Sequence, residues 1–211
     1  MKNWISEYRK NYKHLLSQRT ASGLKRGLST DVYNRSEGFD ILFENLFQIK
    51  KRNFQIIETG TLRNPNNWKD GNSGFLFTEL VKYHNGVVRS VDIDKKAVEV
   101  ANTFIGSKHY QSYCSDSVLW LKSQEDLANV DLFYLDSYDV KWHNDEPSAS
   151  HHLNEFLAIE PHLENCLVCI DDNAFKLDGT RTGKGRKIFE YLEKKNILPI
   201  YDKYQIIYKF S

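Results

Sequence analysis

The sequence predicts an α/β fold in which a doubly wound, mostly parallel sheet carries helices on both faces. From residue 54 onward, apolar runs of about five residues alternate with helical stretches of about ten, a pattern typical of parallel strands buried on both faces. The last two apolar runs, 197–203 and 204–210, lie too close together for a parallel crossover. They predict an antiparallel pair at one sheet edge, so we expect seven strands with an antiparallel strand at the C-terminus.

Two helices are expected before the sheet. The first covers roughly residues 3–20, where apolar side chains recur at helical spacing. The second is expected to begin near Ser29 to Asp31, which are suitable N-cap residues, and to end near Lys51.

The remaining elements alternate along the chain. The expected strands are residues 54–59, 87–94, 109–116, 130–139 and 165–173, followed by the pair 197–203 and 204–210. The expected helices are residues 74–86, 96–106, 117–123, 148–163 and 186–196. We therefore expect an N-terminal helical extension over residues 1–52, which caps a cleft or builds a substrate pocket, and a ligand-binding domain over residues 53–211. Homodimerisation through the extension is the alternative.

The composition argues against several classes of protein. The 29 Lys and Arg residues nearly balance the 28 Asp and Glu residues, so no net field marks a nucleic-acid-binding protein. No apolar run approaches the ~18 residues of a membrane span, and the N-terminus is too charged for a secretory signal. Three cysteines do not form an even disulfide framework, which favours a reducing, cytoplasmic compartment.

The first strand ends at a glycine turn. Ligands of open parallel sheets bind outside the carboxyl ends of the strands, and this strand ends in Glu58-Thr59-Gly60-Thr61. Glycine permits a tight turn and a close approach of a ligand to the backbone. A turn without a ligand is the alternative. The G-x-G-x-x-G pattern of dinucleotide folds is absent, which argues against NAD.

The next two strands end in acidic residues. Asp92 follows the second strand, where a carboxylate can accept both hydroxyls of a ribose, and Ile93 and Asp94 come directly after it. The third strand is followed by Asp116 and Ser117, where a side chain can reach an adenine amine. Capping of the following helix is the alternative role for Asp94 and Asp116.

Two acidic clusters are expected to meet at one edge of the cleft. The fourth strand is followed by Asp136 and Asp139, and the fifth by Asp171, Asp172 and Asn173. Adjacent carboxylates repel one another unless they are protonated or neutralised by a cation. Oxygen ligands suit a hard cation such as Mg²⁺, so a magnesium site is one interpretation and a set of solvated loop aspartates is the other.

These features in this order resemble a class I S-adenosylmethionine (SAM)-dependent methyltransferase with its Rossmann-like sheet. The resemblance covers residues 54–210 and rests on Glu58-Thr59-Gly60, on Asp92 and on the strand ends VDLFYLDSYD and VCIDDN. It is closest in pattern to the metal-dependent small-molecule O-methyltransferases of the catechol and macrocin types. Their E-x-G motif is followed by G-x-S; here Ser73 comes after a longer loop. The resemblance implies SAM contacts from Glu58, Thr59, Gly60, Thr61, Ser73, Asp92, Ile93, Asp116, Ser117 and Asp136.

The same resemblance implies a metal site and a reaction. Asp136, Asp172 and Asn173 match the family's ligands for a divalent cation such as Mg²⁺, which would lower the pKa of an acceptor hydroxyl. The family places a Lys or His base three residues past its first metal ligand, and here that position is Asp139; Asp139 or Lys141 is expected to help with the proton. The expected acceptor is a small polyhydroxylated molecule, such as a sugar, a nucleotide sugar or a catechol.

Other functions stay open. A protein or nucleic-acid methyltransferase is disfavoured by the balanced charge and by the lack of an N/D-P-P-Y/F motif after the fourth strand. A non-catalytic SAM-binding relative is a further alternative. The glycine-rich basic stretch 175–187, which contains Lys184, is expected to be a mobile lid, an anion-binding segment or a plain flexible loop.

Overall fold

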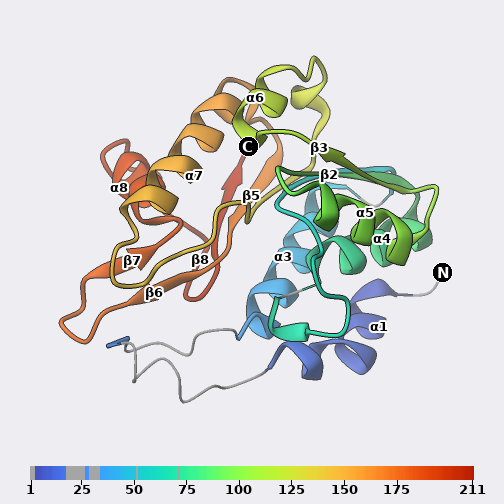
Figure 1. Ribbon diagram of the computed structural model, residues 1–211, viewed down its shortest axis with the longest axis horizontal. Helices are drawn as coiled ribbons and strands as arrows, with labels where there is room; N and C mark the ends of the chain where they lie inside the picture. The colour runs from blue at the N-terminus through green and yellow to red at the C-terminus, as the bar shows by residue number, and fades with distance from the viewer. Residues whose placement is uncertain (1–2, 18–26, 29–33, 51, 71) are drawn as a thin grey trace.

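The computed structural model describes residues 3–17, 27–28, 34–50, 52–70 and 72–211 (Figure 1). The strands of the main sheet are β1 (Phe54–Thr59), β2 (Gly86–Asp92), β3 (Tyr110–Cys114), β4 (Leu132–Leu135), β5 (Cys166–Ile170), β8 (Tyr201–Asp202) and β9 (Ile206–Phe210). Their order across the sheet is β3-β2-β1-β4-β5-β9-β8. Strands β1 to β5 pair in parallel, whereas β9 is antiparallel to both β5 and β8. The predicted seven-stranded, doubly wound sheet with its antiparallel C-terminal strand is confirmed.

Helices cover both faces of this sheet, because side chains alternate along its buried strands. The helices are α1 (Trp4–Asn11), α3 (Ser36–Ile49), α4 (Ser73–His84), α5 (Lys95–Ile105), α6 (Ser117–Lys122), α7 (Glu146–Ile159) and α8 (Arg186–Glu193). In β4, Leu132 and Tyr134 face the core shared with α1, α3 and α4, whereas Phe133 and Leu135 face the core shared with α6, α7 and α8. None of these helices is long and apolar enough to cross a membrane.

The N-terminal helices differ from the expected boundaries. The helix expected over residues 3–20 stops at Asn11 and continues as a short 3-10 turn, Lys13–Leu16. The caps expected at Ser29 to Asp31 lie outside the part of the chain that the structure describes, and α3 begins at Ser36. Arg35 stands at the N-cap position but cannot cap the helix, because a guanidinium has no acceptor for the first N–H groups. Its guanidinium instead binds carboxylates after β5.

The N-terminal segment shares its core with the sheet. Trp4 and Tyr8 of α1 are buried against Phe43 of α3, with ring centroids 5.5 and 5.1 Å apart. Phe39 in turn stacks on Tyr134 of β4 at 5.8 Å. The division into an extension and a ligand-binding domain at residue 52 stays a prediction, but its two parts pack on one another.

The basic stretch 175–187 is not a plain loop. It contributes to β6 (Asn173–Phe175) and β7 (Arg181–Gly183), which pair antiparallel in a separate hairpin that projects beyond the end of β5 (Figure 1). Directly after β7 the chain turns back to the sheet and buries Lys184, whose exposed fraction is 1%.

Candidate functional site

The site is built where the strand order reverses, between β1 and β4. Such a switch point leaves a crevice outside the carboxyl ends of the strands. The Asp136 backbone N–H donates to the Thr59 carbonyl at 2.9 Å, so the two strand ends lie side by side. Gly60 has a φ of +81°, and a Cβ there would stand 2.6 Å from the Asp136 carbonyl oxygen. Only glycine fits this approach.

Three adjoining cavities follow the strand ends. The central hollow is lined by Glu58, Gly60, Thr61, Ser73, Asp92 and Asp136, among others. On one side it shares Asp92 and Ser137 with a second cavity of about 190 Å³, here called the slot. On the other side it shares Arg63, Asp70 and Asp136 with a third cavity of about 250 Å³, here called the outer cavity. The three cavities share walls and lie next to one another along the strand ends.

Glu58 is the buried acid of the central hollow. Its carboxylate is 1% exposed and accepts hydrogen bonds from the hydroxyls of Ser73 and Ser90, the latter at 2.8 Å. Burial raises the pKa of Glu58 to about 7, although both hydroxyls oppose that shift. The E-x-G and Ser73 predicted as one motif are therefore in direct contact.

Asp92 is fixed in orientation while keeping capacity for a ligand. Its two carboxylate oxygens accept backbone N–H bonds from Thr61 at 3.0 Å and Asp94 at 2.8 Å. Each oxygen has a second lone pair, so the carboxylate can still accept two hydroxyl donors. Asp94 also caps α5 by accepting from the Lys96 N–H at 2.8 Å, which confirms the capping role expected for it. The ligand role of Asp92 stays a prediction.

The slot gathers predicted residues from three strand ends. It is lined by Asp92, Ile93, Asp116, Ser117, Ser137, Tyr138 and His151. Ile93 is 75% exposed, and the Tyr138 ring lies 5.4 Å from the His151 ring. Asp116 meanwhile caps α6 by accepting from the Leu119 N–H at 2.9 Å. The lining is mainly apolar with polar groups at its rim, as a planar heterocycle requires.

A second buried acid, Glu155 of α7, was not singled out in the sequence. It accepts from the hydroxyls of Thr59 at 3.1 Å and Ser137 at 2.6 Å, and its carboxylate lies 3.3 Å from His151 Nε2. The Thr59 side chain is thus engaged beneath the crevice rather than free for a ligand. The spacing of His151 and Glu155, one helical turn apart on α7, was the available sequence signal.

The acidic clusters after β4 and β5 meet as expected, but a lysine lies between them. Lys184 Nζ donates to the carboxylate of Asp136 and lies 2.9 Å from Asp172 Oδ2. On the other side Arg35 Nε lies 2.5 Å from Asp171 Oδ2, and its Nη2 lies 3.2 Å from Asp172 Oδ1.

These contacts set the protonation of the cluster. Burial raises the pKa of Asp136 well above its ordinary value. Burial acts on Asp172 in the same direction, but Lys184 and Arg35 outweigh it and hold the pKa of Asp172 below its ordinary value.

The predicted magnesium ligands do not fit a bound divalent cation. Asn173 donates its amide to the carbonyls of Ile170 at 2.9 Å and Asp171 at 3.0 Å, while its Oδ1 accepts from the Gly185 N–H at 2.7 Å. Among the residues described, no group of three His, Cys, Asp or Glu side chains could hold a metal. The expectation of Mg²⁺ is not supported, because the space between the carboxylates holds an ammonium group instead.

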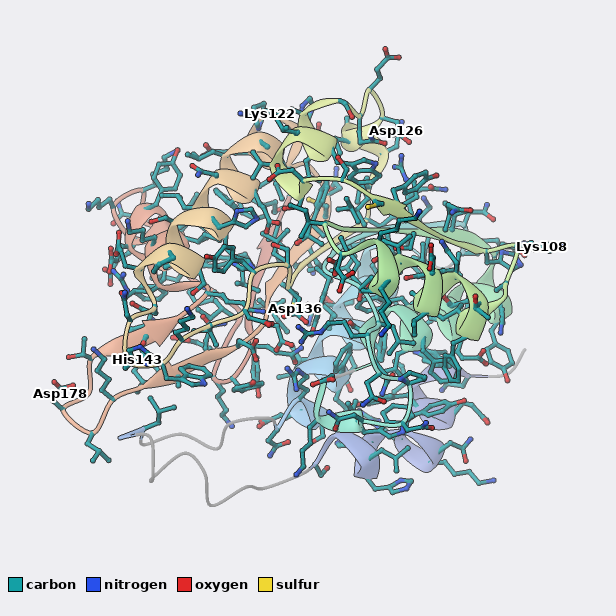
Figure 2. All side chains as sticks on the ribbon, in the orientation of Figure 1. Lys108, Lys122, Asp126, Asp136, His143 and Asp178 are labelled. Atoms are coloured by element: carbon teal, nitrogen blue, oxygen red, sulfur yellow. The ribbon has the colours of Figure 1, made fainter. Side chains whose placement is uncertain are left out.

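The predicted catalytic residues lie further out. Asp139 accepts from Arg63 Nη1 at 2.9 and 3.0 Å, and its side chain is 71% exposed. It lines the outer cavity, whereas Lys141 is exposed and does not. Figure 2 shows Asp136 near the middle of the molecule, with His143 well away from it toward the β6–β7 hairpin. The catalytic roles of Asp139 and Lys141 stay predictions.

No family model matches this sequence, and a search of curated proteins finds no match. Among solved structures, an rRNA methylase from Streptococcus thermophilus superposes with a TM-score of 0.50 at 11% identity, over 82% of this chain and 97% of that one. A TehB-like SAM-dependent methyltransferase from Corynebacterium glutamicum gives 0.46 at 11% identity, over 84% and 97%. MycE methyltransferase from the mycinamycin biosynthetic pathway gives 0.43 at 14% identity, over 65% of this chain but 31% of that one. At such identities the likeness concerns the fold alone: the chain has the Rossmann-like fold of SAM-dependent methyltransferases.

Proposed function

We propose that this protein is a SAM-dependent methyltransferase that methylates a hydroxyl group of a small polyhydroxylated molecule, such as a sugar, a nucleotide sugar or a catechol. The observation that carries the proposal is the row of three cavities with shared walls at the switch point. A nucleoside-sized slot and a polar outer cavity open on the two sides of one central hollow. A methyl group held in that hollow would therefore lie between a nucleoside in the slot and an acceptor in the outer cavity.

The residues that line the slot and the central hollow suit the nucleoside and the methionine part of SAM. Ile93 and Tyr138 offer apolar surface for an adenine in the slot, and Asp92 offers the acceptor pair that a ribose diol needs. The methionine part would lie in the central hollow beside Glu58, whose carboxylate complements an α-amino group, and over Gly60, which lines that hollow. Bound SAM supplies an electrophilic methyl group for in-line displacement.

The outer cavity suits a hydroxyl-rich acceptor. Its lining mixes donors and acceptors: Arg35 and Arg63 stand with Asp136 and Asp139, and Trp142 adds an aromatic face. Hydroxyl groups both donate and accept, so they satisfy such a mixture, whereas the long run of phosphates in a nucleic acid meets repulsive carboxylates. This lining supports a small hydroxylated acceptor over a nucleic acid.

Carboxylates of the protein can accept the proton that the acceptor hydroxyl loses. Asp136 and Asp139 both face the outer cavity. Burial raises the pKa of Asp136, which brings this carboxylate nearer to the range that a general base requires. Alignment of the hydroxyl with the methyl group is the larger contribution that the site makes.

Calorimetric titration with S-adenosylhomocysteine tests the cofactor half of the proposal. Wild-type protein is expected to bind with and without EDTA. Asp92→Ala is expected to weaken binding at least tenfold, since a charged hydrogen-bond acceptor is worth about 1.5–3 kcal/mol. Asp178→Ala at the tip of the β6–β7 hairpin, far from Asp136 in Figure 2, is the matched control. Absence of binding by the wild-type protein would overturn the proposal.

Transfer of labelled methyl from SAM tests the acceptor half. Sugars, nucleotide sugars and catechols form one panel, and total RNA and a protein mixture form the second. Label confined to the second panel would replace the small acceptor by a macromolecule.

A further inference from the structure

Lys184 is an unusual residue for this molecule because it is buried. Among the Lys and Arg side chains that the structure describes, Arg35 and Lys184 are the ones shielded from solvent, at 3% and 1% exposure. Burying a charge is costly unless partners compensate it. A lysine in such a position therefore has a specific task for its ammonium group.

The ammonium group has all its donors used. A lysine carries three N–H donors, and Lys184 Nζ has three oxygen neighbours: the Asp136 carboxylate, the Asp136 carbonyl at 3.2 Å and Asp172 Oδ2 at 2.9 Å. These oxygens come from the ends of two adjacent strands, β4 and β5. Lys184 thus lies between the two carboxylates and offsets the repulsion between them across the strand ends.

The backbone on both sides of Lys184 is shaped to bring it there. The Lys184 N–H donates to the Asp172 carbonyl at 3.1 Å. Gly183 has a φ of +112°, and a Cβ on it would lie 2.3 Å from that same carbonyl oxygen; a Cβ on Gly185 would lie 2.7 Å from Asn173 Oδ1. The two glycines allow the chain to lie against residues 172–173, and the Asn173 amide, a predicted metal ligand, clamps Gly185 instead.

We propose that Lys184 is the resident cation of this site and stands where a divalent metal ion would otherwise bridge the carboxylates of Asp136 and Asp172. A divalent cation would need a set of about six oxygen ligands in the same space, and the ammonium excludes it. Through Asp136, which lines both the central hollow and the outer cavity, Lys184 acts as a positioning residue for the reaction. That last role rests on the proposed function, whereas the identity of the resident cation does not.

Replacement of the lysine tests the proposal by metal binding. Lys184→Met removes the charge and leaves an unbranched side chain that is one atom shorter. The variant is expected to unfold about 10 °C lower than wild type, since breaking a buried ion pair is costly. It is also expected to gain a saturable Mn²⁺ site, seen by electron paramagnetic resonance and calorimetry, and to recover stability with Mn²⁺ or Mg²⁺ but not with EDTA. Wild type and Lys195→Met, which removes an exposed lysine paired with Glu160, are expected to show neither change.

Two results would overturn the proposal. One is a saturable Mn²⁺ site in the wild-type protein that Asp136→Asn removes, because the lysine would then leave room for the metal. The other is a Lys184→Met variant with wild-type stability and no metal response. If Lys184→Met does not fold, titration of the wild-type protein with Mn²⁺ still tests whether the site has room for a metal. Lys184→Arg then tests whether stability depends on a cation at this position. We expect Lys184→Arg to retain its stability only if the positive charge is what matters. None of these measurements requires methyl transfer, so their failure is distinct from a failure of the proposed function.

Discussion

The two halves of the crevice use the same kind of residue in opposite ways. On the β1–β2 side, Asp92 is held by backbone N–H groups alone, so its carboxylate keeps spare lone pairs for a ligand. On the β4–β5 side, Asp136 and Asp172 are neutralised by Lys184 and Arg35. Position at a strand end places an acid in the crevice, but its partners decide whether it is available.

The largest effect is expected where the two halves touch. Gly60→Ala places a Cβ against the Asp136 carbonyl in a left-handed backbone position, so we expect a loss of about 2–4 kcal/mol in the free energy of unfolding and no binding of S-adenosylhomocysteine. Urea unfolding and calorimetry measure the two effects. Gly179→Ala is the matched control, because Gly179 has a φ of +83° with nothing within 4 Å of its Cβ position. Equal losses in both variants would show that backbone conformation, not the contact between the halves, is what matters.

The next largest effect is expected from the protonation of Glu58, which changes the free energy of unfolding with pH. The pKa of Glu58 is raised by burial from 4.5 to about 7, so the folded state binds a proton that the unfolded state has released between these values. Stability from this group is fully present below about pH 4.5 and is lost as pH rises through about 7, an effect of about 3 kcal/mol.

Glu58→Gln is expected to remove this slope. Urea unfolding of wild type and variant at several pH values between 4.5 and 8 gives the measurement, with Asp178→Asn as an exposed control. A wild-type slope that persists in the Gln variant would assign the titration to another group.

A smaller effect is expected from the slot. Tyr138→Ala removes an aromatic face that is half exposed there, and stacking on a base is worth about 1–3 kcal/mol, so the affinity for S-adenosylhomocysteine should fall about tenfold. Leu198→Ala, which truncates an exposed apolar side chain of 67% exposure that does not line the cavities described above, should change nothing. Unchanged affinity in Tyr138→Ala would move the nucleoside out of the slot.

Periodicity predicted the sheet and the strand-end positions of Glu58 and Asp92 because both depend on local sequence. Strand ends follow directly from the apolar runs, and residues such as Glu58 and Asp92 come to one edge through topology alone. The state of the acidic cluster depends instead on Arg35, 136 residues from Asp171, and on Lys184, 48 residues from Asp136. No periodic pattern reports such pairings. The glycines on both sides of Lys184 were a sequence signal for the close approach of this segment, but they equally fitted a flexible loop.

The smallest effect is expected at the outer carboxylate. Asp139 and Arg63 form an exposed pair, and such pairs are worth about 0–1 kcal/mol, so Asp139→Ala should leave stability and cofactor affinity close to wild type. If Asp136 takes the acceptor proton, turnover of that variant should fall less than tenfold, and Lys141→Ala should match wild type, since Lys141 lies outside the cavity lining. Steady-state rates over a pH range give the measurement. A fall of about 100-fold in Asp139→Ala with unchanged cofactor affinity would be the loss of a general base. It would assign the proton transfer to Asp139 and leave Asp136, held by Lys184, as a purely electrostatic partner of the central hollow.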